Sequence, residues 1–256
     1  MRHITYLLLT IILSLVLFIT YNKSEANPGG VKMENEKVTK RVGSLIKVRP
    51  EYEERYIILQ KHTFPGVLDR IRKSNIRNYS IFLLDGMLFS YYEYIGNDYE
   101  ADMNAMADSN TKDWWKLTDP MQEPLPDRKK GKWWAEMEQI LDLKKMVGPS
   151  ENAQRIALVA EVIAGKEEDL KQMCEKFPKG LEEETNDQDF QNCHLFFKDG
   201  KIYYYYEYVG NDLRKSMGEI NKSKKFTAFQ SDMNNNYLVR KSDGYWQVMK
   251  EVFHTN

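Results

Sequence analysis

Tyr91-Tyr92-Glu93-Tyr94-Ile95-Gly96-Asn97-Asp98 returns 114 positions later as Tyr205-Tyr206-Glu207-Tyr208-Val209-Gly210-Asn211-Asp212. The agreement extends outward at the same spacing, because Asn78, Phe82, Asp85 and Gly86 meet Asn192, Phe196, Asp199 and Gly200. Further along, Trp134 and Met137 meet Trp246 and Met249. Eight near-identical residues with matching flanks indicate an internal repeat. The sequence therefore predicts two homologous units, 41–144 and 153–256, joined by a linker over 145–152.

The order of elements within one unit predicts the fold class. Residues 42–48 are β-prone, 51–61 have apolar residues at helical spacing, and Asp85-Gly86 between two apolar runs indicates a β-hairpin. A second helix is expected over 99–107 and a last strand over 136–143. The order β-α-β-β-α-β is typical of ferredoxin-like units in the α+β class. Helices would cover one face of each sheet, and the bare faces would pack together. We therefore expect the two units of one chain to form an α/β barrel together, as an intramolecular pseudo-dimer. The protein itself is then expected to be a monomer.

The N-terminal segment predicts export. Arg2 and His3 precede an apolar run over 4–21, and the small residues Ser24 and Ala26 follow it. A basic start, an apolar stretch and a small-x-small exit are typical of a secretory signal peptide over 1–26. The alternative is an uncleaved membrane anchor over 4–21, because the run is nearly long enough to span a bilayer. Residues 27–40 are expected to be a linker. Either alternative places the remainder of the chain outside the cytoplasm, so the protein is expected to be periplasmic or secreted. Contact with a membrane is expected only through residues 4–21, if they are not removed.

Composition excludes several classes of function. The chain has 256 residues, with 37 Lys+Arg against 38 Asp+Glu, and its net charge of −1 argues against nucleic acid as a partner. Two cysteines, Cys174 and Cys193, are too few for a disulfide framework; they could pair after export or simply be packed. Beyond the N-terminal segment only three histidines occur, without metal-ligand spacing: His62, His194 and His254. Neither a metal site nor a phosphate-binding loop is indicated.

Aromatic residues are the richest chemical feature of the chain. Tyrosine and tryptophan rings can stack on the apolar faces of a sugar while their polar groups bind its hydroxyls. They can equally fill a core, and alternation along the strand favours that role for Tyr91–Tyr94. Trp114 and Trp115 are different, because adjacent residues on a helix point about 100° apart and do not both fit one core.

One predicted helix carries a second candidate group. Tyr56 and Gln60 stand four residues apart, so a phenol and an amide share a helix face that could bind a polar ligand. An exposed helix face without a ligand explains the same spacing. His62 lies about 200° around the helix from Gln60 and is expected to point elsewhere.

Several segments in order and spacing resemble the L-rhamnose mutarotase family. They are Val42–Glu51, Phe64–Leu68, Ile76–Leu83, Phe89–Tyr94, Trp114–Pro120 and Trp133-Trp134, and together they cover nearly all of 41–144. The resemblance implies a dimeric ferredoxin-like α/β barrel that interconverts the α and β anomers of a deoxy-sugar without a cofactor. It also implies that Tyr56, Tyr79, Trp114 and Trp115 contact the sugar. Gln60 stands where the family has its catalytic histidine.

The second unit resembles a diverged copy of the first. The corresponding places hold Asp169 or Leu170, Met173 and Cys193, and Phe226-Thr227-Ala228-Phe229 replaces the tryptophan pair. This unit is expected to supply the other half of the barrel without a site of its own.

Gln60 leaves two functions open, because an amide hydrogen-bonds but does not transfer protons. The first is an exported mutarotase for L-rhamnose or a related deoxy-sugar. The second is a sugar-binding relative without catalysis. A third and weaker hypothesis is another activity of dimeric α/β barrels, such as that of a cofactor-free monooxygenase.

Overall fold

A computed structural model describes residues 38–143, 152–177, 181 and 189–256. The signal peptide or anchor expected over 1–26 lies outside these residues, as do all but the ends of the linkers expected over 27–40 and 145–152. Within the described ranges, no helix is both long enough and apolar enough to cross a membrane.

The first half of the chain has strands and helices at the places predicted for the first unit. Its strands are β1 (Lys40–Val48), β2 (Ile76–Leu84), β3 (Met87–Tyr94), β4 (Gln122–Glu123), β5 (Ala135–Glu136) and β6 (Glu138–Leu143). Its helices are η1 (Pro50–Tyr52), α2 (Glu53–Lys61), α3 (Pro65–Lys73), α4 (Tyr99–Ala105), α5 (Ser109–Thr118) and η2 (Asp119–Met121).

The described part of the second half has fewer elements. Its strands are β7 (Gln154–Glu161), β8 (Phe190–Lys198), β9 (Lys201–Tyr208) and β10 (Gln247–Thr255), and its helices are α6 (Glu167–Glu175), α8 (Leu213–Ile220) and α9 (Lys224–Tyr237). The hairpin predicted at Asp85-Gly86 is confirmed, and Asp199-Gly200 forms another between β8 and β9. Asp85 and Gly86 have φ values of 49° and 73°, and Asp199 and Gly200 have 51° and 68°. Two consecutive positive φ angles are what a tight two-residue hairpin turn requires.

All the strands belong to one antiparallel sheet in the order β4-β1-β3-β2-β10-β7-β9-β8-β6, with β5 paired to β1. The last strand of each half joins the two halves. β10 pairs with β7 through Gln247–Met249 and then with β2 through Lys250–Thr255. In the same way β5 pairs with β1, and β6, which follows it, pairs with β8. These two crossings close the sheet on itself.

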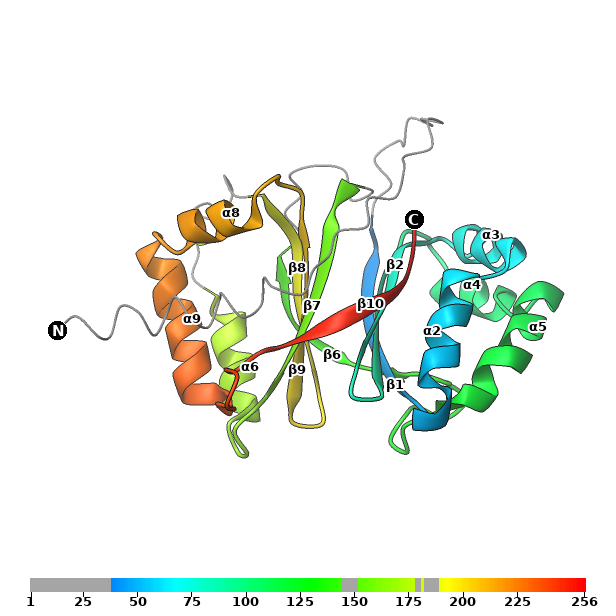
Figure 1. Ribbon diagram of the computed structural model, residues 1–256, viewed down its shortest axis with the longest axis horizontal. Helices are drawn as coiled ribbons and strands as arrows, with labels where there is room; N and C mark the ends of the chain where they lie inside the picture. The colour runs from blue at the N-terminus through cyan, green and yellow to red at the C-terminus, as the bar shows by residue number, and fades with distance from the viewer. Residues whose placement is uncertain (1–37, 144–151, 178–180, 182–188) are drawn as a thin grey trace.

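The helices form two outer layers. Figure 1 shows α2, α3, α4 and α5 on one side of the strands and α6, α8 and α9 on the other, with β10 crossing between the halves. Each half therefore has its own apolar cluster between helices and sheet. Helix amphipathicity accounts for this arrangement, because each helix can bury its apolar face only against the sheet.

A third apolar cluster lies between the two halves and draws residues from both. Phe82 and Phe89 of the first half pack there with Phe196 and Tyr203 of the second. The two halves approach so closely that a Cβ atom on Gly43 would lie 2.6 Å from Cδ1 of Phe196. A glycine is therefore needed in β1 at this point.

Buried polar groups at the same contact bind across the halves. Asn78 Nδ2 donates a hydrogen bond to Glu207 Oε1, and Asn192 Nδ2 donates one to Glu93 Oε1. Asn78 and Asn192 both have positive φ, 49° and 54°, where β2 and β8 depart from regular register. The irregular backbone turns each amide toward the carboxylate of the other half.

Candidate functional site

The sugar-contacting residues expected from sequence lie together in the first half. Tyr56 and Trp114 belong to the buried apolar cluster between the helices and the sheet, and Tyr79 and Trp115 pack against it. Tyr56 comes from α2, Tyr79 from β2, and both tryptophans from α5. Four rings from three elements therefore gather in one region of the fold.

Tyr56 is held deep in this region, with 1% of its surface exposed. Its hydroxyl accepts a hydrogen bond of 3.3 Å from Gln122 Nε2, and Gln122 Oε1 accepts one of 2.8 Å from Trp133 Nε1. Burial raises the pKa of Tyr56, and the neighbouring Tyr79 raises it further, while hydrogen bonds from Gln122 and Gln60 lower it. Because the net change is upward, the phenol stays protonated at neutral pH.

Tyr79 is half-buried on β2 between two other rings. It meets Tyr92 edge to face at 5.5 Å between centroids and Phe253 of β10 at 5.4 Å. Burial raises the pKa of Tyr79 above its usual value of 10, so this phenol also stays protonated. The ring links the first-half cluster to the C-terminal strand.

The two adjacent tryptophans differ in exposure. Trp114 is 6% exposed and meets Phe64 edge to face at 5.2 Å, whereas Trp115 is only partly buried. Their positions on α5 account for the difference, because consecutive helical residues point about 100° apart. Trp115 is the more accessible of the two indole rings.

Gln60, in the last turn of α2, borders a cavity of about 430 Å³. Its exposed fraction is 8%, and its side chain lies close enough to Tyr56 to lower the pKa of that phenol. The cavity is lined by Gln60, Lys61, Thr63, Leu68, Glu251, Val252, Phe253 and His254. The four aromatic side chains expected to contact the sugar are not among these lining residues. Phe253 connects the two regions, because it lines the cavity and packs against Tyr79.

The C-terminal strand brings two titratable residues to this cavity that sequence reasoning did not place there. Glu251 is held by Arg155, whose Nε donates a hydrogen bond of 3.0 Å to Oε2. Burial raises the pKa of Glu251, and the charge and hydrogen bond of Arg155 oppose that rise. His62, the histidine nearest to Gln60 in sequence, is exposed and is not one of the lining residues.

His254 lies beside Glu251 in the lining of the cavity. Its Nδ1 is 3.0 Å from Ser80 Oγ, and its Nε2 is 3.1 Å from Asn256 Oδ1. Burial lowers the pKa of His254 to about 3, and the nearby Arg155 acts in the same direction. The imidazole is therefore neutral near pH 7 and a weak base.

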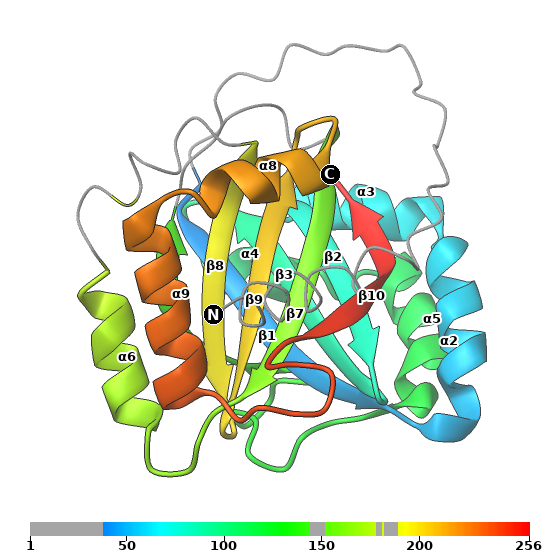
Figure 2. The same cartoon turned by 60° about the vertical axis from the view of Figure 1, so that its left-hand side comes forward.

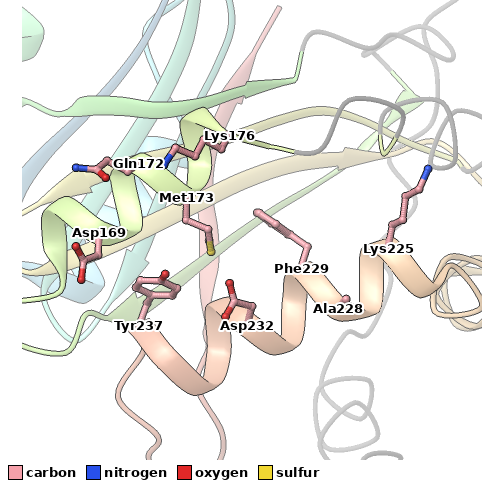
Figure 3. A pocket seen from close by; sticks show the side chains of 9 residues that line it. All are labelled: Asp169, Gln172, Met173, Lys176, Lys225, Ala228, Phe229, Asp232 and Tyr237. Carbon is pink, nitrogen blue, oxygen red and sulfur yellow. The ribbon is translucent and has the colours of Figure 1, made fainter.

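The second half has a cavity of its own, of about 630 Å³, between α6 and α9. Figure 3 shows Met173, Phe229 and Tyr237 lying between the two helices, with Asp169 and Asp232 beside them. Asp169 or Leu170, and Met173, are the residues expected from sequence at the places of Tyr56 and Gln60. Residues 251–254 of β10 line the first-half cavity, whereas every described residue that lines this one comes from the α6 and α9 region.

The described part of the chain contains neither a cluster of metal-binding side chains nor a disulfide. Among residues 38–143, 152–177, 181 and 189–256, no group of three or more His, Cys, Asp or Glu side chains is placed to hold a metal ion. Cys174 is buried in α6 and Cys193 is partly buried in β8, and the two do not form a disulfide. Of the two alternatives for these cysteines, the structure has the one in which they are simply packed.

Comparison with known proteins gives a family match over the first half. The sequence model of the family described as L-rhamnose mutarotase matches residues 41–143. An L-rhamnose mutarotase of Ligilactobacillus salivarius is 29% identical over 99 residues, which are 36% of this chain and 87% of the relative. Another, from Lactiplantibacillus plantarum, is 30% identical over 90 residues, which are 34% of this chain and 84% of the relative.

Solved structures match over a greater length of the chain. A protein from Lactobacillus acidophilus described as a monooxygenase has a TM-score of 0.51 at 7% identity, over 84% of this chain and 96% of that one. One from Fusobacterium nucleatum, also described as a monooxygenase, has a TM-score of 0.48 at 16% identity, over 82% and 92%. The former supports a mixed α/β fold with a curled antiparallel sheet and ferredoxin-like relatives.

Proposed function

The chain belongs to the L-rhamnose mutarotase family, and on that premise we propose that it is an exported enzyme that interconverts the α and β anomers of L-rhamnose or a related deoxy-sugar. The supporting observation is the gathering of Tyr56, Tyr79, Trp114 and Trp115 around one region inside the matched segment. Aromatic rings suit a pyranose, because its CH faces stack on them. These four are proposed as the sugar-binding residues.

An apolar surrounding also suits a 6-deoxy-sugar. Such a sugar carries a methyl group where a hexose such as L-mannose carries a hydroxymethyl group. A methyl group packs against rings without needing a hydrogen-bond partner, whereas a buried hydroxyl without one loses free energy. We therefore expect faster equilibration of L-rhamnose than of L-mannose.

The test is the rate at which a freshly dissolved anomer equilibrates with catalytic amounts of protein, followed by polarimetry or one-dimensional NMR. Acceleration above the rate in buffer supports the proposal, and a rate equal to buffer contradicts it. Export is tested separately, by locating the protein in cell fractions and sequencing its N-terminus. A start near Asn27 would indicate cleavage, and an intact start in the membrane fraction would indicate an anchor.

A second candidate function is sugar binding without catalysis, and Gln60 is the observation that favours it. The amide can donate and accept hydrogen bonds but cannot carry a proton. Calorimetric titration with L-rhamnose distinguishes the two functions. Heat of binding with no acceleration of mutarotation supports the binding protein. If the sugar gives no heat of binding and does not raise the thermal midpoint, both functions are contradicted.

We further propose that the tandem units act as an intramolecular pseudo-dimer. The strands that cross between the halves, β10 and the β5–β6 segment, support this view, because each half completes the sheet of the other. A chain of this kind has no need of a second copy. Light scattering during size-exclusion chromatography is expected to give the mass of one chain, and a dimer mass would contradict the proposal.

A further inference from the structure

The proposed reaction needs a group that moves a proton. Ring opening removes the proton of the anomeric hydroxyl, breaks the bond between C1 and the ring oxygen, and adds a proton to that oxygen. Gln60 cannot carry the proton, and the raised pKa values of Tyr56 and Tyr79 keep both phenols protonated. Among the residues already assigned to the site, none is an effective base near neutral pH.

The cavity beside Gln60 contains a carboxylate and an imidazole that do not belong to the family-matched segment. Glu251 and His254 both come from β10, at the end of the second half, and line the cavity together with Gln60. Both nitrogens of His254 have hydrogen-bond partners, Ser80 and Asn256. With a pKa of about 3, this imidazole accepts a proton poorly. Glu251 is the better candidate.

Three features of Glu251 suit a proton carrier. A third of its side chain is exposed, 34%, so it is partly desolvated but within reach of a ligand. Arg155 fixes the position of the carboxylate through a hydrogen bond of 3.0 Å to Oε2. Burial brings its pKa upward, toward the range where a carboxylate exchanges protons well near neutrality. The charged or titratable groups around it are Arg155 of β7, Lys61 of α2 and His254 of its own strand.

We propose that Glu251, carried into the first half by the C-terminal strand, is the catalytic residue that moves the proton between the anomeric hydroxyl and the ring oxygen. This assignment rests on the proposed mutarotase function. Glu251 takes the hydroxyl proton as the C1–O bond of the ring breaks and the electron pair passes to the ring oxygen. The same proton then moves from Glu251 to that oxygen and leaves the open-chain aldehyde. Reclosure on the other face of the aldehyde reverses both transfers and returns the carboxylate.

Gln60 has a defined part in this scheme. Its amide hydrogen-bonds the ring oxygen while charge develops there, which lowers the barrier without any transfer of a proton. Arg155 keeps the carboxylate in place through Oε2. The site is therefore complete only when β10 pairs with β2, although the two strands are far apart in sequence. Figure 2 shows β10 running beside β2 on the side of the molecule that carries α2 and α3.

Among the described residues, a carboxylate from a crossing strand lines the cavity of the first half and not that of the second. In the repeat, Gln139 of β6 stands where β10 has Glu251, and Asp142 stands where β10 has His254. Both β6 residues contact His194 rather than the cavity between α6 and α9, with Gln139 Nε2 at 3.4 Å and Asp142 Oδ1 at 3.1 Å from its Nδ1. The asymmetry between the two crossing strands agrees with a single proposed site, in the first half.

The test compares Glu251→Gln with wild type in NMR exchange measurements on L-rhamnose. We expect at least a 100-fold lower rate in the variant and an affinity for the sugar, measured by calorimetry, that changes only a few-fold. The matched control is Glu138→Gln, which removes an ion-paired carboxylate from β6 (2.7 Å to Lys171) and is expected to keep the wild-type rate. A wild-type rate in Glu251→Gln would overturn the assignment but not the mutarotase function.

A second variant covers the case in which Glu251→Gln does not fold. Glu251→Asp keeps the carboxylate, so it should retain part of the rate and the same pH profile, with activity falling on acidification through a pKa above the ordinary 4.5 of glutamate. A profile without that fall, in wild type and Glu251→Asp alike, would overturn the assignment. A wild-type protein no faster than buffer would instead overturn the proposed function, and the role of Glu251 with it.

Discussion

The rings of Tyr91 and Tyr205 stack on each other at the contact between the two halves, with centroids 3.8 Å apart and planes inclined by 16°. The two residues occupy the same place in the repeat, and both are fully buried. Each hydroxyl donates a hydrogen bond of 2.9 Å to the glutamate two residues further on, Glu93 or Glu207. One pair of equivalent side chains thus combines apolar and polar contacts where the halves meet.

Removing one ring of this pair should destabilise the whole protein. Tyr205→Ala leaves a cavity in a packed interface, and we expect a loss of about 3–5 kcal/mol in the free energy of unfolding. Tyr205→Phe keeps the ring but deprives Glu207 of a buried donor, at a cost of about 1–3 kcal/mol. Urea denaturation measures both. Tyr245→Phe is the control, because the hydrogen bond from its hydroxyl to Asn235 is exposed to solvent. A comparable loss there would contradict the explanation.

Gln60→His restores an imidazole at the place where the family has its catalytic histidine. Because the side chain lies at the cavity and beside Tyr56, an imidazole there could exchange protons near neutral pH. We expect mutarotation at least about 10-fold faster than in the wild type, followed by polarimetry. His62→Gln, at an exposed position two residues on, should leave the rate unchanged. An unaltered rate in Gln60→His would count against a sugar bound beside this position.

The two tryptophans of α5 should respond differently to truncation. Trp114→Ala removes a buried ring packed on Phe64 and should cost about 3–5 kcal/mol of folding free energy. Trp115→Ala removes a partly exposed ring, so we expect a smaller loss of stability and roughly 10-fold weaker sugar binding. Thermal unfolding and calorimetric titration separate the two effects. Equal loss of stability with unchanged affinity in Trp115→Ala would exclude it from the proposed site.

The low pKa of His254 predicts a loss of stability on acidification. Because its pKa falls from 6.5 to about 3 on folding, the unfolded chain binds more protons between these values. The contribution of His254 to stability is therefore complete above pH 6.5 and is lost progressively as the pH falls toward 3. Glu251, with its pKa raised on folding, acts in the opposite direction and gains stability as the pH falls.

The variant His254→Gln tests how much His254 contributes to the pH dependence of the free energy of unfolding. We expect the variant to lose less stability than wild type between about pH 7.5 and about pH 5.5, measured by urea denaturation at each pH. His62→Gln serves as the exposed control and should follow the wild type. An identical loss in wild type and His254→Gln would show that this imidazole is not desolvated in the folded protein.

Much of the local structure could be predicted from the residues alone. Asp85-Gly86 predicts a hairpin because these residues tolerate the positive φ that the turn requires, and both have it. Helical spacing places Tyr56 and Gln60 on one face of α2, and both are buried. Adjacency on a helix accounts for one buried and one accessible tryptophan on α5.

The pairing of distant strands could not be predicted in the same way. Alternation along 247–255 indicates which side chains share a face, but it does not indicate which strand edge β10 will join. The expected ferredoxin-like order does not reveal that β10 leaves β7 after Met249 and continues along β2. Nothing in the sequence pattern therefore indicates that Glu251 and His254 are neighbours of Gln60.

The sequence by itself determined the repeat, the order of elements and the family, because these depend on residues close together along the chain or on direct matches between segments. Only the tertiary structure decided which groups meet. Tyr91 stacks on Tyr205, and Glu251 reaches the cavity of Gln60, because backbone hydrogen bonding and apolar burial between distant strands select one pairing of edges. That selection depends on the free energy of the whole sheet, and no local pattern carries it.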